Sequence, residues 1–554
     1  MNRLYYGDNL TVLKGCIADE SVDLIYLDPP FNSQATYNVL FRSTAGERSR
    51  AQIEAFDDTW HWGDEAELAF DGVMHGPSTD AAEMLRAMRA FLKENDLMAY
   101  LSMMAVRLSE LQRVLKPTGS LYLHCDPTAS HYLKILLDGI FGKENFRNEI
   151  IWKRTSAHSS TKGYGAVHDV ILFYAKTGDF LWNEQFGPYE EQYVEAFFTH
   201  TDEKGRRWRR TDLTGPGVRK GDSGLPWRDY NPTTVGRHWQ PPSYFYDKYT
   251  ALTGDELSKY DLLDRLEKMD AIGLIHWPKK EGGMPMGRRL LEDAPGIPLQ
   301  DLWVDIKIMH NMSSERLGYA TQKPQALLER IIQSSSNEGD VVLDPFCGCG
   351  TTIHAAQKLK REWIGIDITH LAISLIEKRL KDAFPGIKYE VHGTPKDLDG
   401  ARDLAARDKY QFQWWAVSLV NAVPFAGKKK GADSGIDGLI YFKPEGKITE
   451  KAIVSVKGGE NVNVAMVRDL AHVVDREKAK IGVFITLADS TGPMRTEAVT
   501  AGFYETLYGK YPKIQILTIR ELFEGKQPNI PLVDTSAFKK ATKEKTGAQD
   551  ALPF

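Results

Sequence analysis

Asp28-Pro29-Pro30-Phe31 combines residue types that rarely occur together at the end of an apolar run. The preceding segment, Val22–Leu27, is mostly apolar and reads as a buried strand. A carboxylate there accepts hydrogen bonds, consecutive prolines fix the local backbone, and an aromatic ring offers a face for stacking. The alternative interpretation is a proline-rich stop to the strand with a capping aspartate.

A second apolar run, Val341–Leu343, leads through a glycine-containing turn into a helix predicted to start at Thr351. Glycines such as Gly348 and Gly350 allow backbone to approach a ligand closely, and a helix N-terminus presents free N–H groups. Asp367 ends the next strand, nineteen residues after Gly348, where an acid can accept from ribose hydroxyls.

The turn differs from the dinucleotide fingerprint, because its third glycine is missing and an acid precedes it. It therefore favours a nucleoside without a pyrophosphate. An ordinary strand–turn–helix is the alternative. Cys347 and Cys349 lack the spacing and the partners of a metal site, so we interpret them as packing residues.

The elements that must position these residues alternate between strand and helix. Such alternation predicts a mostly parallel, doubly wound α/β sheet. The predicted strands are Val22–Leu27, Leu121–His124, Glu149–Trp152, Val341–Leu343 and Trp363–Ile366. The predicted helices are Tyr100–Leu115, His131–Phe141, Gln325–Ser334, Thr351–Lys360 and His370–Phe384.

The periodic pattern breaks and resumes, which divides the 554-residue chain into domains. Between the two halves of the α/β domain, Gly, Pro, Trp and Arg crowd together. A charged linker, a third unit of helices and strands, and a Lys/Thr/Ala-rich flexible tail follow. The predicted boundaries are 1–152 with 315–395 for the α/β domain, 153–314 for the insert, 396–409 for the linker, 410–530 for the third unit and 531–554 for the tail.

The composition of the sequence indicates which compartment and which kinds of partner to expect. The sequence has no apolar run of membrane-spanning length and no apolar signal segment near its start, so we expect no membrane partner. Four cysteines in a chain of this length exclude a disulfide framework and suit a reducing cytoplasm. The net charge of −5 means that any nucleic-acid partner needs a local basic surface.

The two motifs together resemble those of the amino-group DNA methyltransferases, which use S-adenosylmethionine. Asp28-Pro29-Pro30-Phe31 matches that family's catalytic tetrapeptide, and the segment 344–351 matches its cofactor loop. The order, with the catalytic motif first and a long insert between, resembles the family's β class. Gly7-Asp8-Asn9-Leu10 and Thr321-Gln322-Lys323-Pro324 resemble two further motifs of the family.

This resemblance implies roles for the first motif. The amine of a base is a poor nucleophile, and acceptors on its two hydrogens push it toward tetrahedral geometry. Asp28 would supply one acceptor and the carbonyl of Pro29, fixed by Pro30, the second. Phe31 would stack on a base taken out of the duplex. Aspartate at this position favours N6 of adenine over N4 of cytosine, which remains the alternative.

The resemblance also implies a set of cofactor residues. Asp344 would meet the amino group of the cofactor, Asp367 its ribose, Asp8 its adenine and Lys323 its amino-acid end. For Asp8 the alternative is a helix cap, and for Lys323 a surface lysine. The remaining residues expected around the cofactor are Pro324, Phe346, Cys347, Gly348, Gly350 and Thr351.

The insert carries the local basic surface that the net charge hides. Residues 201–240 hold nine lysines and arginines against five acidic residues. Phosphate contacts and base-edge contacts both require such groups. We therefore predict contacts with double-stranded DNA, although a solvated charged face is the alternative. The predicted DNA-binding residues are Arg206, Arg207, Arg209 and Arg210.

The third unit resembles the Mrr-like restriction endonucleases of the PD-(D/E)xK type. The resemblance implies that Asp437 would be a ligand of Mg²⁺ and that Lys457 would assist an attacking water. Ser455 stands where an acid or glutamine is expected, and Gln411 and Gln413 stand in the preceding helix rather than a glutamate. A nuclease-like fold kept for DNA binding or assembly is the alternative.

Three functional hypotheses follow from these patterns. The first is an adenine-specific DNA methyltransferase of a restriction–modification or defence system, with a C-terminal domain that only binds. The second is a bifunctional enzyme that both methylates and cuts DNA. The third is a nucleotide-binding protein that transfers no methyl group. Analogy with the family suggests a homodimer.

Overall fold

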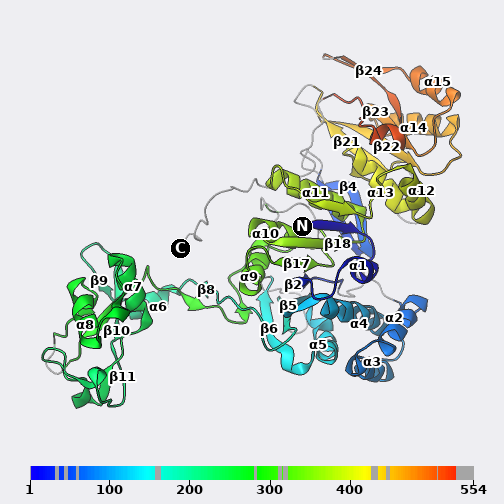
Figure 1. The fold of residues 1–554 in the computed structure, drawn as a ribbon. Coiled ribbons are helices and arrows are strands. Elements are labelled where there is room, and N and C mark those ends of the chain that lie inside the picture. The colour runs from blue at the N-terminus through cyan, green and yellow to red at the C-terminus, as the bar shows by residue number, and fades with distance from the viewer. Residues whose placement is uncertain are drawn as a thin grey trace. The chain divides into compact units, whose positions relative to one another are not determined.

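The protein is described by a computed structural model that forms two compact units, residues 1–183 with 300–549 and residues 184–299 with 550–554 (Figure 1). The residues described are 2–30, 36–42, 48–57, 61–155, 164–279, 283–309, 315, 322–425, 435–444, 449–507 and 509–531.

The first unit contains a nine-stranded sheet with the order β16-β6-β7-β5-β2-β17-β18-β1-β19. The strand β7 runs antiparallel to β5 and β6, and the other pairings are parallel. The strands are β1 (Arg3–Tyr6), β2 (Val22–Leu27), β5 (Leu115–Cys125), β6 (Phe146–Lys153), β7 (His168–Ala175), β16 (Leu302–Trp303), β17 (Val341–Asp344), β18 (Glu362–Asp367) and β19 (Glu390–His392). A separate hairpin pairs β3 (Thr36–Arg42) with β4 (Arg48–Asp57).

Helices cover both faces of this sheet, which confirms the doubly wound α/β fold. Ile25 and Leu27 of β2 pack in one core with α1–α5, whereas Leu24 and Tyr26 pack in a second core with α9–α11. A strand buried on both faces must be apolar almost throughout, which explains the run at β2. The helices are α1 (Asn9–Cys16), α2 (Asp64–Met74), α3 (Thr79–Leu92), α4 (Asp96–Val114), α5 (Pro127–Phe141), α9 (Gln325–Ser335), α10 (Thr351–Lys358) and α11 (His370–Ala383).

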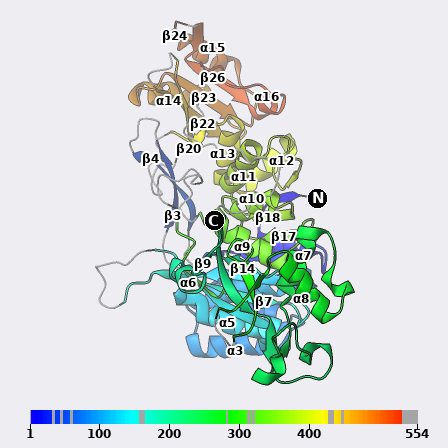
Figure 2. The ribbon, with the colours of Figure 1, turned by 90° about the vertical axis from the view of Figure 1, so that its left-hand side faces the viewer.

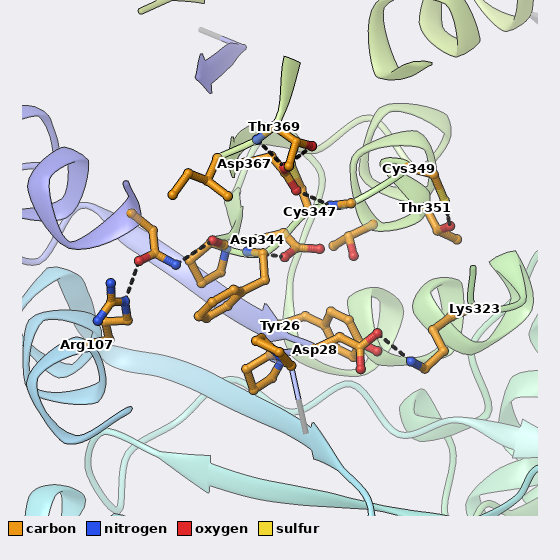
Figure 3. Close-up of a pocket in the computed structure, with 18 of the residues that line it drawn as sticks. Tyr26, Asp28, Arg107, Lys323, Asp344, Cys347, Cys349, Thr351, Asp367 and Thr369 are labelled. Atoms are coloured by element: carbon orange, nitrogen blue, oxygen red, sulfur yellow. Dashed lines mark hydrogen bonds and ion pairs between the residues drawn. The ribbon is translucent and has the colours of Figure 1, made fainter. Parts of the chain in front are cut away.

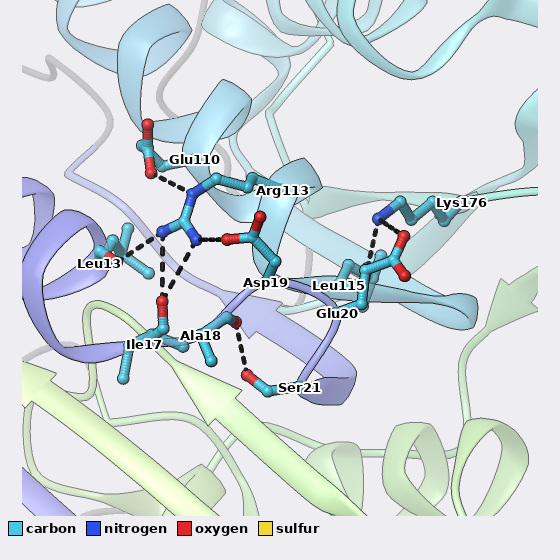
Figure 4. A network of polar contacts seen from close by, with 10 residues as sticks. All are labelled: Leu13, Ile17, Ala18, Asp19, Glu20, Ser21, Glu110, Arg113, Leu115 and Lys176. Carbon is cyan, nitrogen blue, oxygen red and sulfur yellow. Dashed lines mark hydrogen bonds and ion pairs between the residues drawn. The ribbon is translucent and has the colours of Figure 1, made fainter.

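Arg113 of α4 fixes the turn that leads from α1 into β2 (Figure 4). Its guanidinium donates to the carbonyls of Leu13 at 2.7 Å and Ile17 at 3.3 Å, and it pairs with Glu110 and Asp19. Backbone carbonyls at the end of a helix are otherwise unsatisfied, so one arginine stabilises the whole turn. This arrangement sets the start of the strand that ends at Asp28.

The second unit is smaller than the insert that the sequence predicted at 153–314. The strands β7 and β16 lie inside that range but belong to the central sheet, because their residues are apolar and pair with β5 and β6. The compact unit therefore starts at 184 and ends at 299 within the insert. Its elements are β8 (Phe186–Gly187), α6 (Glu191–Phe197), β9 (His200–Thr201), β10 (Arg207–Asp212), β11 (Thr214–Pro216), β12 (Arg237–Trp239), α7 (Ser243–Thr253), α8 (Leu262–Ala271), β13 (Ile275–His276), β14 (Met286–Leu290) and β15 (Ile297–Pro298).

A small aromatic core holds this second unit together. Trp227, Trp239 and Phe245 are buried with Leu266 and Met269. Short strands in the order β13-β14-β10-β9 form its main sheet. Few of these elements are long enough to give a periodic sequence pattern, which explains why the segment reads as irregular.

The C-terminal part of the first unit is a five-stranded sheet with the order β20-β21-β22-β23-β26. Figure 2 shows α14 and α16 on opposite sides of it, and each side has its own apolar core. The elements are α12 (Leu398–Arg407), α13 (Lys409–Leu419), β20 (Val423–Pro424), β21 (Gly438–Phe442), β22 (Glu450–Lys457), α14 (Val464–Arg476), β23 (Ile481–Thr486), α15 (Gly492–Thr500), β24 (Phe503–Thr506), β25 (Gly509–Pro512), β26 (Ile514–Thr518) and α16 (Ile519–Phe523).

The predicted linker at 396–409 is wrong for most of its length, because it forms α12. Ala401, Leu404 and Ala405 of this helix are buried in the core of the C-terminal sheet. The charged residues occupy the opposite, exposed face of the helix, and they dominate the composition of the segment. The predicted tail at 531–554 lies, except for its first residue, outside the described residues. Within the described part of the chain, no helix is long and apolar enough to cross a membrane.

Candidate active site

Three aspartates lie at the carboxyl ends of neighbouring parallel strands (Figure 3). Asp28 follows β2, Asp344 ends β17 and Asp367 ends β18. Ligands of open α/β sheets bind at this edge. All three aspartates line one cavity of about 200 Å³. The two motifs found in the sequence therefore meet in space.

The loop from β17 to α10 requires glycine at two positions. Gly348 has a φ of 49° and Gly350 a φ of 74°, both in the left-handed region. A Cβ atom on Gly350 would lie 2.7 Å from Cγ1 of Ile376, so a side chain there would clash. The loop residues that line the cavity are Phe346, Cys347, Gly348, Cys349 and Thr351, and Gly350 supports the turn behind them.

Asp367 organises this loop as well as facing the cavity. One carboxylate oxygen accepts from the N–H of Gly348 at 2.9 Å, and the other accepts from the N–H and hydroxyl of Thr369 at 2.8 Å. Burial raises the pKa of Asp367 to about 6, although these hydrogen bonds act in the opposite direction. The site thus places a carboxylate with a raised pKa where the sequence predicted a ribose acceptor.

Asp344 is more deeply buried, with 3% of its surface exposed. It accepts from the N–H of Phe346 at 3.0 Å. Burial, together with the negative charges of Asp28 and Asp367, raises the pKa of Asp344 to about 7. A cation bound beside Asp344 would favour its carboxylate form, so the residue fits the predicted role opposite an amino group.

Asp28 and Lys323 form an ion pair inside the cavity (Figure 3). The ammonium of Lys323 contacts Oδ2 of Asp28, whereas Oδ1 has no partner among the described residues. The sequence predicted Lys323 near the amino-acid end of a cofactor and did not predict this contact. Pro29 and Pro30 also line the cavity, and Phe31 lies outside the described residues.

Asp8 caps α1 and also lines the cavity, so both interpretations of this residue describe its position. Its Oδ2 accepts from the N–H of Thr11 at 2.9 Å, and its Oδ1 accepts from Arg107 at 2.7 Å. Arg107 donates to Oδ1 of Asn9 at 2.6 Å, and Asn9 donates to the carbonyl of Pro345 at 2.9 Å. Arg107 lines the cavity but carries no motif signal, so sequence reasoning missed it.

Arg379 is a second residue that the sequence did not reveal. It is 4% exposed and lies on α11. Its guanidinium donates to the carbonyl of Cys349 and to the hydroxyl of Thr351, both at 3.2 Å. Arg379 therefore holds the glycine loop from the side away from the cavity. Pro324 likewise acts indirectly, since it caps α9 and does not line the cavity.

The four arginines predicted to bind DNA divide into two pairs. Arg206 is bound to Asp202 at 2.8 Å, and Arg209 donates to the hydroxyl of Tyr193 at 3.0 Å. Arg207 and Arg210 are exposed, and their side chains make no ion pair within the described residues. Only the second pair is therefore open for phosphate contacts.

One face of β10 and β14 combines cations with aromatic rings. Arg210 lies opposite Arg288 in the strand register, and the guanidinium of Arg288 lies 5.2 Å from the ring centroid of Trp208. Trp208 stacks on His200 at 4.4 Å and lies 5.1 Å from His276. Burial lowers the pKa of His276, and the charges of Arg210 and Arg288 lower it further. Arg288 and His276 lie far from the basic run in sequence, His200 lies six residues before it, and all three were missed.

The predicted nuclease residues lie on neighbouring strands of the C-terminal sheet. Oδ2 of Asp437 accepts from the N–H of Val456 at 2.6 Å, between Ser455 and Lys457 on β22. Ser455 is 4% exposed and supplies a hydroxyl rather than a charge. Within the described residues, no group of three His, Cys, Asp or Glu side chains gathers as a metal site. One carboxylate is a weak donor set for Mg²⁺, so we derive no cleavage step from it.

Comparison with known proteins defines the class. Residues 22–378 match the family model described as DNA methylase, and residues 404–510 match the one described as restriction endonuclease. The first match covers most of the chain, so the chain belongs to the DNA methylase family. It is a DNA methyltransferase of the restriction–modification type with a C-terminal restriction-endonuclease domain. The second match begins within α12, in agreement with the place of that helix in the C-terminal core.

Individual relatives cover large parts of the chain. The type II methyltransferase M.EcaI of Enterobacter cloacae is 31% identical over 68% of this chain and 69% of its own length. The Mod subunit of the type III restriction-modification enzyme StyLTI of Salmonella typhimurium is 28% identical over 65% of this chain and 50% of its own length. A putative DNA modification methylase from Thermus thermophilus, solved with S-adenosyl-L-methionine, is 17% identical over 71% of this chain with a TM-score of 0.31.

Proposed function

We propose that this chain transfers a methyl group from S-adenosylmethionine to the exocyclic N6 of adenine in double-stranded DNA. The observation that carries the proposal is the position of Asp28 in the same cavity as the Asp344–Asp367 loop region. One pocket thus holds an acceptor for an amine and a set of groups suited to a nucleoside with a cationic amino acid. The target base would leave the duplex to reach it.

The residues of this chain would prepare the amine for attack. Oδ1 of Asp28, which has no partner within the described residues, would accept one N–H of the target, and Lys323 engages Oδ2 and holds the carboxylate in place. The carbonyl of Pro29 would accept the second. When bound, the cofactor supplies a methyl group on a sulfonium. The amine nitrogen would gain the methyl group as the S–C bond breaks and a neutral thioether leaves, and the carboxylate of Asp28 would be placed to take up the proton that the amine loses.

The groups around the loop would hold the cofactor. Asp367 would accept from ribose hydroxyls, since each carboxylate oxygen can accept more than one hydrogen bond. Asp344 would face the amino group, where burial strengthens a charge–charge contact. The N–H groups of the glycine loop and the N-terminus of α10 would face the carboxylate end.

The choice of adenine over cytosine follows from the aspartate at position 28. The experiment incubates the full chain with S-adenosylmethionine tritiated on the methyl group and unmethylated duplex DNA, then digests the DNA to nucleosides. Label in N6-methyl-2′-deoxyadenosine supports the proposal, and label in N4-methyl-2′-deoxycytidine contradicts the choice of base. The full chain with Asp28→Asn is the control, because it preserves the shape of the side chain but removes its charge.

For double-stranded DNA we propose contacts with the open face of β10 and β14. On this face Arg210 and Arg288 would meet phosphates and Trp208 would pack on sugar or base, whereas Arg207 points to the opposite face of β10 and would need a separate phosphate. Support comes from the exposed, unpaired state of Arg207 and Arg210 among the described residues.

For the C-terminal domain we propose a role in holding DNA. The second candidate is metal-dependent cleavage, which Lys457 favours, because a lysine at this strand end can stabilise charge on a phosphate. The two are separated by incubating the chain with unmethylated and methylated DNA and Mg²⁺ or Mn²⁺. Cleavage that is lost in both Asp437→Ala and Lys457→Ala would establish the second candidate.

A further inference from the structure

A buried chain of polar side chains leads away from the cavity across three strands. Tyr26 of β2 lines the cavity, and its hydroxyl lies 2.8 Å from Nδ1 of His124 on β5. Nε2 of His124 lies 3.1 Å from Oδ2 of Asp169 on β7. Arg154, whose side chain is 42% exposed, lies 3.4 Å from the other oxygen of Asp169 and ends the chain.

The three inner residues are almost inaccessible to water. Tyr26 is 2% exposed, His124 0% and Asp169 1%. Trp152 packs edge-on against His124, with ring centroids 5.7 Å apart. Burying a carboxylate and an imidazole costs free energy even when both are hydrogen-bonded, and apolar side chains at these positions would avoid that cost. A structural role alone therefore does not explain Asp169 and His124. No motif contains these residues, and the predicted chemistry does not use them.

The donors and acceptors of this hydrogen-bonded series can be assigned by starting at Asp169. A carboxylate only accepts, so Nε2 of His124 must carry the proton that it donates to Asp169. In a neutral imidazole, Nδ1 is then an acceptor, and the hydroxyl of Tyr26 must donate to it. With its proton committed, the oxygen of Tyr26 retains only acceptor capacity.

The charges around the chain keep this order in place. Burial lowers the pKa of His124, and the nearby Lys323 lowers it further, so the imidazole is neutral. Burial alone would raise the pKa of Asp169, but the hydrogen bond from His124 and the positive charges of Lys323 and Arg154 outweigh it and lower the pKa. The carboxylate form of Asp169 and the neutral form of His124 are those that the donor order requires.

We propose that Asp169 and His124 are positioning residues that make the hydroxyl oxygen of Tyr26 an acceptor for the exocyclic amine of the target base. A base with an amino group at this place would be favoured over one with a carbonyl oxygen, since two acceptors repel. Because the amine has only two hydrogens, the oxygen of Tyr26 would share one of them with Asp28 or Pro29 in a three-centre hydrogen bond. The proposal rests on the proposed use of the cavity for methyl transfer to an amine, but not on which base carries that amine.

The test compares Tyr26→Phe with a matched control in the full-length protein. Tyr122 lies beside Tyr26 in the strand register and is also buried, but its hydroxyl bonds to Ser335 at 2.7 Å. We expect Tyr26→Phe to lower kcat at saturating cofactor and DNA by about tenfold or more, the usual contribution of one hydrogen bond in a dry site. Tyr122→Phe should leave kcat within about twofold. The Kd of the cofactor should change little in either variant, and both should lower the melting temperature by a similar modest amount, because each leaves one buried partner unpaired.

Asp169→Asn tests whether catalysis depends on the direction of the hydrogen bonds between Tyr26, His124 and Asp169. An amide donor at residue 169 would shift the proton of His124 to Nδ1 and turn the hydroxyl of Tyr26 into a donor. We expect a loss of kcat in the otherwise native protein and no further loss when Tyr26→Phe is already present. Wild-type kcat in Tyr26→Phe, or an equal loss from Asp169→Asn with and without the hydroxyl, would overturn the proposal. If Asp169→Asn does not fold, the kcat of Tyr26→Phe decides alone. Methyl incorporation into any base is the readout, so a wrong choice of base leaves this test intact.

Discussion

Replacing Asp367 by alanine should weaken binding of S-adenosylmethionine without unfolding the methyltransferase domain. The carboxylate accepts hydrogen bonds from Gly348 and Thr369 and would accept from the ribose in the complex. A hydrogen bond to a charged group contributes about 1.5–3 kcal/mol. At about 1.4 kcal/mol per tenfold change, Kd should rise roughly 12- to 140-fold. Loss of the hydrogen bond from Gly348 also loosens the loop, so we expect an increase in Kd near the upper end of this range.

Isothermal titration calorimetry of the full chain measures this Kd directly. Glu362→Gln is the matched control, because it removes a carboxylate from the exposed, opposite end of the same strand, β18. Burial raises the pKa of Asp367 to about 6, and a ribose donor favours the ionised form. Affinity should therefore be lost as the pH falls through 6, and Asp367→Asn should abolish that dependence. An unchanged Kd in Asp367→Ala would refute the assignment of this cavity to the cofactor.

Three further outcomes follow from the structure. Burial raises the pKa of Asp344 to about 7, so cofactor affinity should begin to fall as the pH drops below 7, and Asp344→Asn should remove that part of the pH profile in calorimetry. Arg210→Ala should weaken DNA binding and reduce its salt dependence by about one phosphate contact in fluorescence anisotropy titrations, whereas the internally paired Arg206→Ala should leave the salt slope unchanged. Ser455→Glu should raise Mg²⁺- or Mn²⁺-dependent cleavage if a missing ligand limits the C-terminal domain, and equal inertness of this variant and the wild type, with the domain folded, would identify a binding module.

The sheet and the cofactor loop could be predicted because their signals are local. Strands buried on both faces must be apolar almost throughout, and an acidic residue marks the functional edge in both cases, since Asp28 follows β2 and Asp344 ends β17. The left-handed turn at Gly348 and Gly350 requires glycine, which makes it visible in sequence.

The contacts within the site could not be predicted, because they join residues far apart in the chain. Lys323 reaches Asp28 across 295 positions, and Arg107 reaches Asp8 across 99. Each of these lysines and arginines has an ordinary local context, so only the fold reveals its partner. The pairing of Tyr26 with His124 has the same origin.

The helix in the predicted linker and the division of the arginine run have a different cause, since local composition was informative but ambiguous. In α12 the small apolar residues Ala401, Leu404 and Ala405 form one narrow face, which the charges around them conceal. In β10 successive side chains point to opposite faces, so a contiguous arginine run cannot form one surface. Arg207 and Arg209 therefore lie on the side opposite Arg210.

The central claim is that the cavity around Asp28 methylates an exocyclic amine of DNA, and of adenine in particular. Its most direct test is sequencing with modified-base detection of genomic DNA from cells that express the wild-type chain or Asp28→Ala. We predict N6-methyladenine within one fixed sequence motif in the wild-type sample and none in the variant, while the purified variant still binds S-adenosylmethionine. Methylation that persists in Asp28→Ala, or that falls on cytosine N4, would contradict the account.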